Sequence, residues 1–194
     1  MYNRNYNYIK PEDYWVSINQ VHLLQDMNVA WLEHIFWTRL LLISIAENLR
    51  DLNATRTRLL QNPKTISNIF RRYYGVNIAN SIEKLLTEHL VIGEKLIVAL
   101  KNNNQPLAKQ LNDEWYMNAD EMAEAFSNIN PFYVKDEVRN MLYEHLNLTS
   151  NEVAARLRKD YNADIQAFDK VQLEILKMSK YFVDGIIKQF PDIF

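Results

Sequence analysis

The sequence predicts an all-α protein, a helical bundle of four main helices with shorter accessory helices. Only 3 of the 194 residues are Gly, which leaves few of the left-handed turns that hairpin-rich β folds need. Apolar residues recur at alternating spacings of three and four through long windows, the pattern of amphipathic helices. No window alternates with the period of two that is typical of a strand. An apolar content of 48% is enough for a substantial core.

The first half of the chain is expected to form three helices. Pro and Gly are absent between Pro11 and Pro63, and a helix is expected there over about 13–52. Asn62-Pro63 supplies a cap and a first-turn proline for a short helix that ends at Gly75. A third helix is expected over about 77–103. We call the row of positions that faces the predicted core the seam of a helix. In the first helix it consists of Leu24, Met27, Trp31, His34, Thr38, Leu41, Ile45 and Asn48.

The second half is expected to form three more helices, over about 106–129, 134–147 and 150–189. Asn130-Pro131 ends the first of them, because the residue before a proline disfavours the helical conformation. Thr149 and Glu152 have the spacing of a capping box and predict the start of the last helix. We therefore expect one helical-bundle domain over 13–194, ferritin-like or hemerythrin-like in style, after a Tyr/Asn-rich N-terminal leader over 1–12.

Polar residues interrupt the apolar seams at positions that face the predicted core. His34, His89 and His145 lie on three different predicted helices, and Asp164 lies on a fourth. A buried His or Asp must find a partner or it destabilises the fold. Bundle proteins build metal sites from inward side chains of several helices. We expect these four residues to be metal ligands, for iron, manganese or zinc.

A second set of residues is expected to support these ligands or to line a pocket beside them. Each histidine follows a glutamate in a short motif, Glu-His-aliphatic, that recurs three times and that a duplicated helical unit would explain. The supporting set consists of Asn118, Tyr161, Glu33, Glu88, Glu144, Trp37 and Trp115.

The residues leave two alternatives to a metal site open. The polar seam could serve only to specify packing in a non-catalytic structural or interaction module. A small-molecule pocket could instead form among Trp31, Trp37, Trp115 and Tyr161. The dense spacings of familiar metal motifs, such as Glu-x-x-His, are absent from the chain.

Composition excludes several classes of catalyst. The chain has no Cys, so thiolate metal sites and thiol nucleophiles are excluded. It has no Gly-rich phosphate loop, no dinucleotide fingerprint and no G-x-S-x-G elbow. We therefore name no catalytic residue, and a non-enzyme is favoured over an enzyme.

Charge is unevenly distributed although the net charge is only −2. Segment 50–72 has six bases and one acid, whereas segment 113–124 has five acids and no base. No nucleic-acid-binding motif accompanies the basic segment, so nucleic acid is not expected. The basic segment is expected to pair with the acidic segment of this chain or of a second copy in a homo-oligomer, or to bind an acidic partner.

A cytoplasmic location without membrane contact is expected. Residues 1–10 have no apolar core of the kind found in a signal peptide, and the apolar run over 40–46 is too short to span a bilayer.

Six segments are EHIFWTR at 33–39, LLTEHLVI at 85–92, WYMNADE at 115–121, INP at 129–131, EHL at 144–146 and QFP at 189–191. Together they resemble an uncharacterised all-helical family of Bacillota, whose members often carry the label acetylglutamate kinase. The resemblance covers nearly the whole chain and implies a helical fold. The kinase label does not fit, because such a kinase is a larger α/β protein with Gly-rich phosphate loops.

The element E-H-x-x-W at 33–37 is also similar to a second family, the duplicated, metal-associated four-helix bundles. In that family the helix carries a further His about three turns later. The matching positions here are near Ser44, Ala99 and Ala155, so one expected ligand is missing. This resemblance implies the fold more strongly than the activity.

Overall fold

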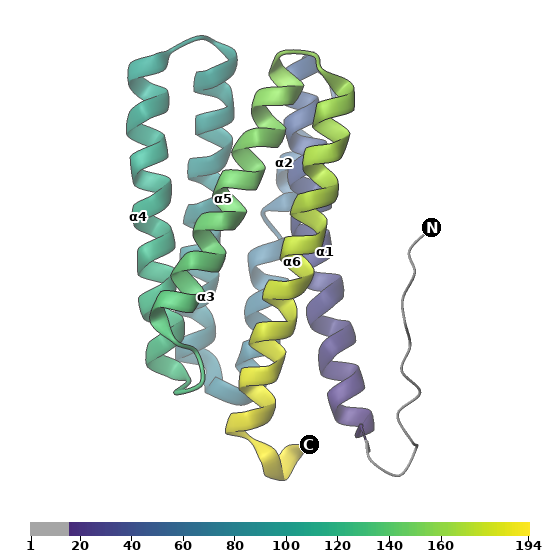
Figure 1. Cartoon of the computed structure of the whole chain (residues 1–194), viewed down its shortest axis with the longest axis vertical. Coiled ribbons are helices and arrows are strands. Elements are labelled where there is room, and N and C mark those ends of the chain that lie inside the picture. The colour runs from purple at the N-terminus through teal and green to yellow at the C-terminus, as the bar shows by residue number, and fades with distance from the viewer. Residues whose placement is uncertain (1–15) are drawn as a thin grey trace.

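The computed structural model describes residues 16–194, and the leader expected over 1–12 lies outside the described residues. These described residues form helices and contain no strand, which confirms the predicted all-α bundle (Figure 1). In chain order the elements are α1 (Ile18–Glu47), α2 (Leu52–Leu59), α3 (Asn62–Lys101), α4 (Gln105–Ile129), α5 (Lys135–Leu157), α6 (Tyr161–Gln189) and a short 3-10 helix, η2 (Pro191–Ile193).

Helix α1 has well-defined ends. Ser17 accepts a hydrogen bond from the backbone N–H of Gln20, and the Gln20 side chain accepts one from the backbone N–H of Ser17. This is a capping box. At the other end Asn48 adopts a left-handed conformation, with φ of 56°. The helix therefore stops before residue 52, and the expectation of one helix to 52 was wrong because α2 is separate.

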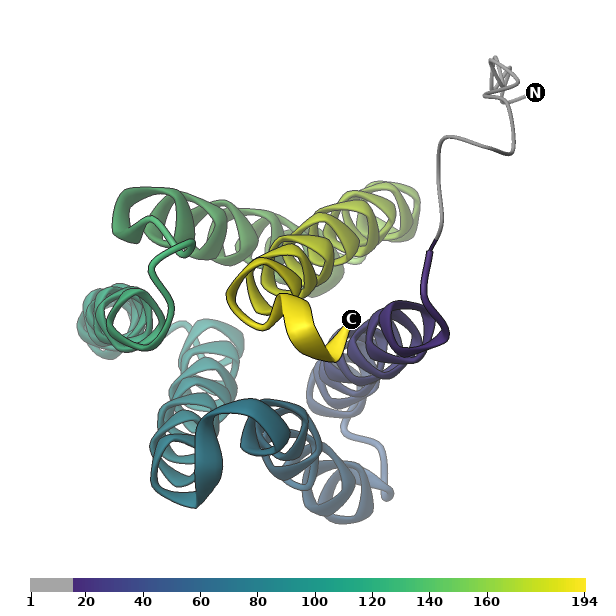
Figure 2. The ribbon, with the colours of Figure 1, turned by 90° about the horizontal axis from the view of Figure 1, so that it is seen from below.

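Helix α3 bends at Gly75, where the sequence predicts a break. Gly75 has φ of 80° and ψ of 177°, a conformation that L-residues rarely adopt. The helix therefore consists of two segments, 62–74 and 76–101, that run in different directions (Figure 2).

The break expected at Thr149 does not occur, because α5 continues through this residue to Leu157. Thr149 and Glu152 follow His145 by four and seven residues, and all three side chains are buried. They belong to the inner face of one helix instead of to a helix start. The turn comes later, where Asp160 caps α6 by accepting a hydrogen bond from the N–H of Ala163.

The helices form three successive hairpins. The first pairs α1 with α2 and the first segment of α3, the second pairs the second segment of α3 with α4, and the third pairs α5 with α6. Helix α1 also packs on α6, and α4 packs on α5, so the hairpins close into a ring (Figure 2). Five of the helices in residues 16–194 have between 23 and 40 residues, instead of the four main helices expected.

The core has two apolar clusters at different heights of the bundle. The larger cluster contains most of the aromatic side chains, and Gly185 packs directly against one of them. A Cβ at Gly185 would lie 2.0 Å from Cε1 of Tyr133, so no larger residue fits there without displacing that ring. The smaller cluster, which we call the upper cluster, consists of Leu41, Leu42, Ile45, Leu59, Leu90, Ile97 and Val153.

Helix α1 is long and apolar enough to cross a membrane by length and composition, which corrects the expectation based on the run at 40–46. An 18-residue window within it has a mean hydropathy of 1.4, and 44% of that window is buried in the bundle. Some of its apolar side chains, such as Val29 and Phe36, are exposed. One such helix near the N-terminus is weak evidence for a span, because the core helix of a soluble bundle passes the same test.

Candidate metal centre

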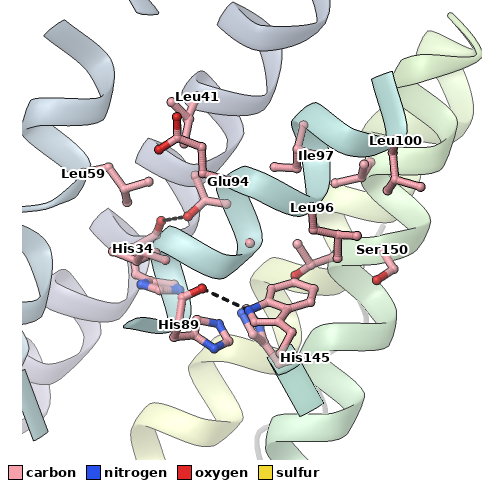
Figure 3. Close-up of a pocket in the computed structure, with 16 residues that line it drawn as sticks. His34, Leu41, Leu59, His89, Glu94, Leu96, Ile97, Leu100, His145 and Ser150 are labelled. Carbon is pink, nitrogen blue, oxygen red and sulfur yellow. Dashed lines mark hydrogen bonds between the residues drawn. The ribbon is translucent and has the colours of Figure 1, made fainter. Parts of the chain in front are cut away.

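Three histidines from three helices meet in the middle of the bundle. His34 lies on α1, His89 on α3 and His145 on α5, so each hairpin contributes one imidazole from its first helix. All three are buried, and one ring nitrogen of each lies within 4.8 Å of the corresponding atoms of the other two. The ring centroids are 5.8, 6.1 and 6.2 Å apart, which describes a nearly equilateral triangle (Figure 3).

Each imidazole is held by a side chain from the opposite arm of its own hairpin, which is the first segment of α3, then α4, then α6. The first pair is His34 with Asn62, in which Nδ1 and Oδ1 are 3.2 Å apart. In the second pair Nδ1 of His89 is 3.2 Å from Oδ1 of Asn118. The sequence separations of these two pairs are 28 and 29 residues.

The third hairpin repeats the arrangement with a charged partner. Nδ1 of His145 is 3.2 Å from Oε2 of Glu174, at a separation of 29 residues. The three Glu-His-aliphatic motifs of the sequence therefore mark equivalent positions in three similar hairpins. The repeat is threefold in the structure, so a unit present three times describes the chain better than a duplication.

The hydrogen bonds also determine which ring nitrogen carries the proton. The Nδ2 group of Asn62 donates to the carbonyl of Ala30, 2.8 Å away, so Oδ1 is the atom that faces His34. An amide oxygen only accepts, and Nδ1 of His34 must therefore donate. The lone pair of this neutral ring is then on Nε2.

The same reasoning applies to the second and third rings. Asn118 donates through Nδ2 to the carbonyl of Leu85, 3.1 Å away, and so presents Oδ1 to His89. A carboxylate oxygen of Glu174, Oε2, accepts from Nδ1 of His145. In each ring Nδ1 is already used, and Nε2 is the nitrogen that remains for an ion.

Burial keeps the imidazoles of His34 and His89 neutral. Burial, followed by the charge of His145, lowers the pKa of His34 from 6.5 to about 3. Burial, followed by the charges of His34 and His145, lowers the pKa of His89 well below 6.5. Both rings are therefore unprotonated at neutral pH, which is the state that a metal ligand needs.

Asp164, expected as a fourth ligand, lies in a different cluster. It is buried and accepts hydrogen bonds from Arg39 at 2.8 and 3.1 Å and from Arg156 at 3.3 Å. Arg39 also pairs with Glu152, whose pKa is raised to about 7, chiefly by burial. Asp164 thus forms ion pairs with two guanidinium groups, and among residues 16–194 the group that could hold a metal consists of the three histidines alone.

Two of the expected supporting residues lie at the His triad. Asn118 holds His89, as described above. Trp115 lies with its ring centroid 5.2 Å from that of His89 and donates from Nε1 to the His89 carbonyl at 3.1 Å. The sequence predicts no specific contact for Trp115 or Asn118, but its helical period places both on the face that lies toward the triad.

The other expected supporting residues lie away from the triad. Tyr161 is 45% exposed and stacks under Arg156, and Trp37 stacks under Arg58. Glu33 forms an ion pair with Arg58 at 2.8 Å.

The two remaining glutamates are at the surface. Glu88 lies 3.7 Å from Lys84, and Glu144 is exposed. Of the four aromatic residues expected to form a small-molecule pocket, only Trp115 lines the cavity beside the triad.

Sequence reasoning missed Asn62 and Glu174. Asn62 precedes a proline and was interpreted as a helix cap, whereas its buried side chain holds His34. Glu174 is a charged residue in a helix that has many, so nothing in the local pattern marks it. The repeated separation of 28 or 29 residues between a His and an Asn or Glu is the signal that could have found both.

The basic segment 50–72 pairs with acids of the same chain, although not with segment 113–124. Arg56 bonds to Glu94, with 2.6 Å between Nε and Oε1, and Arg72 bonds to Asp26 at 2.6 Å. The Arg58–Glu33 ion pair described above involves a third base of the segment. An acidic partner or a second copy at this segment stays a prediction.

The fold and this site together define a class of protein, an all-α bundle of three hairpins with a buried three-histidine centre. Comparisons with protein-family models, curated proteins and solved structures found no match to this chain. The two resemblances noted from the sequence therefore stay predictions.

Proposed function

We propose that this protein binds one divalent transition-metal ion through Nε2 of His34, His89 and His145. The observation that carries the proposal is that all three rings use Nδ1 for a hydrogen bond to an acceptor. Each ring is thereby left with an Nε2 lone pair beside two others. A cation at the centre would satisfy all three.

The dimensions and the chemistry of the triad support zinc or iron. Nitrogens in a tetrahedral site with bonds of about 2.0–2.1 Å lie about 3.3 Å apart, and the triad nitrogens are within 4.8 Å of one another. Binding of an ion would therefore draw the three nitrogens closer together. Imidazole suits zinc and iron, whereas manganese favours carboxylate ligands, so manganese is the least suited of the three expected metals.

The hydrogen bonds around the triad favour a metal site over a network that serves only packing. A packing network pairs each donor with an acceptor. Here Asn62, Asn118 and Glu174 all take up the donor of their ring, and the nitrogens that remain are all acceptors. Three acceptors at one place have no partner in one another, and a positive ion is the complement that they share.

The resemblance to the duplicated E-H-x-x-W bundles supports the same proposal, because those proteins are metal-associated. The ligand missing from that pattern leaves a metal in this chain with an open coordination position. We also propose a cytoplasmic location, since nearly half of the apolar window in α1 is used in the bundle core. Cell fractionation tests this, and recovery in the membrane fraction would overturn it.

Metal analysis of protein purified without a His tag tests the proposed function. We expect close to one equivalent of zinc or iron per chain, and uptake of zinc when the protein is first stripped with a chelator. The variant His89→Leu should take up none, whereas His22→Leu, which changes an exposed histidine, should bind as the unmodified protein does. Circular dichroism establishes that both variants are folded. Less than about a tenth of an equivalent, with no uptake on adding metal, would refute the proposal.

A further inference from the structure

A cavity lies directly beside the histidine triad, on the side of the upper cluster. Its volume is about 30 Å³, where about 10–15 Å³ by the same measure is needed to hold one water molecule. His34, His89 and His145 form one end of it (Figure 3). The rest of the wall is mostly apolar and includes Leu41, Leu59, Leu90, Leu96, Ile97, Leu100 and Val153.

Three equivalent residues line the cavity next to the triad. Each lies one helical turn, four residues, after a ligand histidine, and they are Thr38, Gly93 and Thr149. Residues at this spacing lie one above the other on a helix face. They therefore form the layer between the triad and the upper cluster.

In the first hairpin the threonine hydroxyl of this layer already donates a hydrogen bond within its own helix. Thr38 Oγ1 donates to the carbonyl of His34, one turn earlier, at 2.7 Å. In the second hairpin Gly93 has no side chain, and the indole of Trp115 takes the place of the hydroxyl by donating to the His89 carbonyl. A Cβ at Gly93 would lie 3.3 Å from Cζ2 of Trp115, so a small residue is needed here for the indole to fit.

The third hairpin has the threonine without the hydrogen bond. Thr149 is 5% exposed, and its Oγ1 has no hydrogen-bond partner among residues 16–194. A buried polar group without a partner destabilises a fold and calls for an explanation. Because Thr149 lines the cavity, its hydroxyl is available to whatever occupies that space.

We propose that this cavity is the subsite for a small exogenous ligand that coordinates the bound metal and accepts a hydrogen bond from Thr149 Oγ1. This inference rests on the proposed function. The ligand is a molecule of two or three heavy atoms, neutral or with one negative charge, or a water or hydroxide in its place. The volume limits its size, and the apolar wall excludes strongly hydrated groups.

The charge of the site agrees with this ligand class. A divalent ion with three neutral imidazoles and the Glu174 carboxylate carries a net charge of +1. One monoanion on the metal makes the buried site neutral, and a second would leave an unpaired charge. Glu94, which also lines the cavity, is bonded to Arg56 and does not alter the sum.

Cobalt-substituted protein provides the test, because the visible spectrum of Co²⁺ reports its coordination. Azide, a linear monoanion of three atoms, is the probe. We expect azide to change the spectrum of the full-length Co²⁺ protein in a saturable manner. The variant Thr149→Val should weaken azide binding about ten- to hundredfold, since it removes a hydrogen bond to a charged group.

Three matched comparisons make the test specific. Thr38→Val removes a hydroxyl from the same layer that already bonds to a carbonyl, and should change azide binding by less than about threefold. Thr149→Ser keeps the hydroxyl and should keep azide binding. Benzoate, a monoanion too large for the cavity, should leave the spectrum unchanged. Thr149→Val should fold at least as well as the unmodified protein, because it removes a buried hydroxyl that has no partner.

The possible failures are distinguishable. If Co²⁺ does not bind at all, the proposed function fails and the inference fails with it. If Co²⁺ binds but azide leaves its spectrum unchanged, the metal site stands and the subsite is wrong. Equal weakening by Thr149→Val and Thr38→Val, or a benzoate response as strong as that of azide, would also overturn the subsite.

Discussion

The imidazole of His145 hydrogen-bonds through Nδ1 to the carboxylate of Glu174, with 3.2 Å between Nδ1 and Oε2, and both side chains are buried. In the other two hairpins the equivalent partner is an asparagine amide. The third hairpin therefore places a carboxylate next to the triad, where the other two hairpins place an amide. A carboxylate in this position makes the imidazole a stronger ligand and partly balances the charge of an ion.

Replacing this carboxylate should weaken metal binding without abolishing it. We expect Glu174→Gln to lower the affinity for Zn²⁺ about 10- to 100-fold, because the amide keeps the hydrogen bond but not the charge. Competition with a chromophoric chelator measures the affinity. Glu144→Gln is the control, since it removes the same charge from an exposed residue next to His145 and should leave the affinity unchanged. Equal affinities of Glu174→Gln and the unmodified protein would contradict this role.

The metal-free protein should lose stability in acid because of its buried histidines. The pKa of His34 is lowered to about 3 by burial, from 6.5 in the unfolded chain, so unfolding takes up a proton between these pH values. The contribution of His34 is complete above about pH 6.5 and is lost as the pH falls toward 3, by up to about 1.4 kcal/mol per pH unit. His89 acts in the same direction.

Urea unfolding at several pH values measures this dependence. His34→Leu should flatten the fall in stability below pH 6.5, whereas His22→Leu, at an exposed position, should leave it as it is. The raised pKa of Glu152 acts in the opposite direction between about pH 7 and 4.5, but it is present in both variants. Equal slopes in the two variants would show that burial of His34 does not govern the acid response.

Asp164 should matter for stability and not for metal binding. Its carboxylate is 0% exposed and faces Arg39 and Arg156. We expect Asp164→Asn to lower the free energy of unfolding by about 3–5 kcal/mol, because it removes the buried carboxylate that Arg39 and Arg156 share. Zinc affinity of the folded variant should stay within about threefold. Asp169→Asn, which changes an exposed carboxylate on the same helix, is the control. Loss of zinc binding in folded Asp164→Asn would instead restore Asp164 as a ligand.

Asn118 should contribute to stability through both ends of its amide. Oδ1 faces Nδ1 of His89, and Nδ2 donates to the Leu85 carbonyl. Asn118→Ala leaves Nδ1 of the buried His89 without its partner and removes a second bond to the Leu85 carbonyl, and we expect a loss of about 2–4 kcal/mol in the free energy of unfolding. Asn128→Ala, at an exposed position of the same helix, should cost less than about 0.5 kcal/mol. Equal losses in the two variants would contradict the role of Asn118.

Local sequence patterns identified the three histidines and one of the partners that hold them, Asn118, but not Asn62 or Glu174. The helical period places His34, His89 and His145 on inner faces, since the apolar neighbours of each histidine define its face. The partners come from other helices, 28 or 29 residues away. Asn62 has the local appearance of a cap, and Glu174 that of a surface charge. Only the packing of one helix on another shows that both side chains turn inward.

The error at Thr149 has a similar cause. A threonine followed three residues later by a glutamate is a sound signal for a helix start when both residues face solvent. In this chain both are buried, Glu152 against Arg39 and Thr149 beside the cavity. A capping box and two inner positions of a continuous helix have the same spacing, and burial is what separates them.

The sequence by itself determined the all-α fold, the bend at Gly75 and the inward position of three histidines, because these depend on composition and helical period within one segment. The tertiary structure decided that the three rings meet at one height and that Asp164 joins two arginines instead. It also decided that one of two equivalent threonines lacks a partner. Such outcomes depend on the axial position and the rotation of each helix relative to its neighbours. Both are set by packing between residues that are distant in the chain.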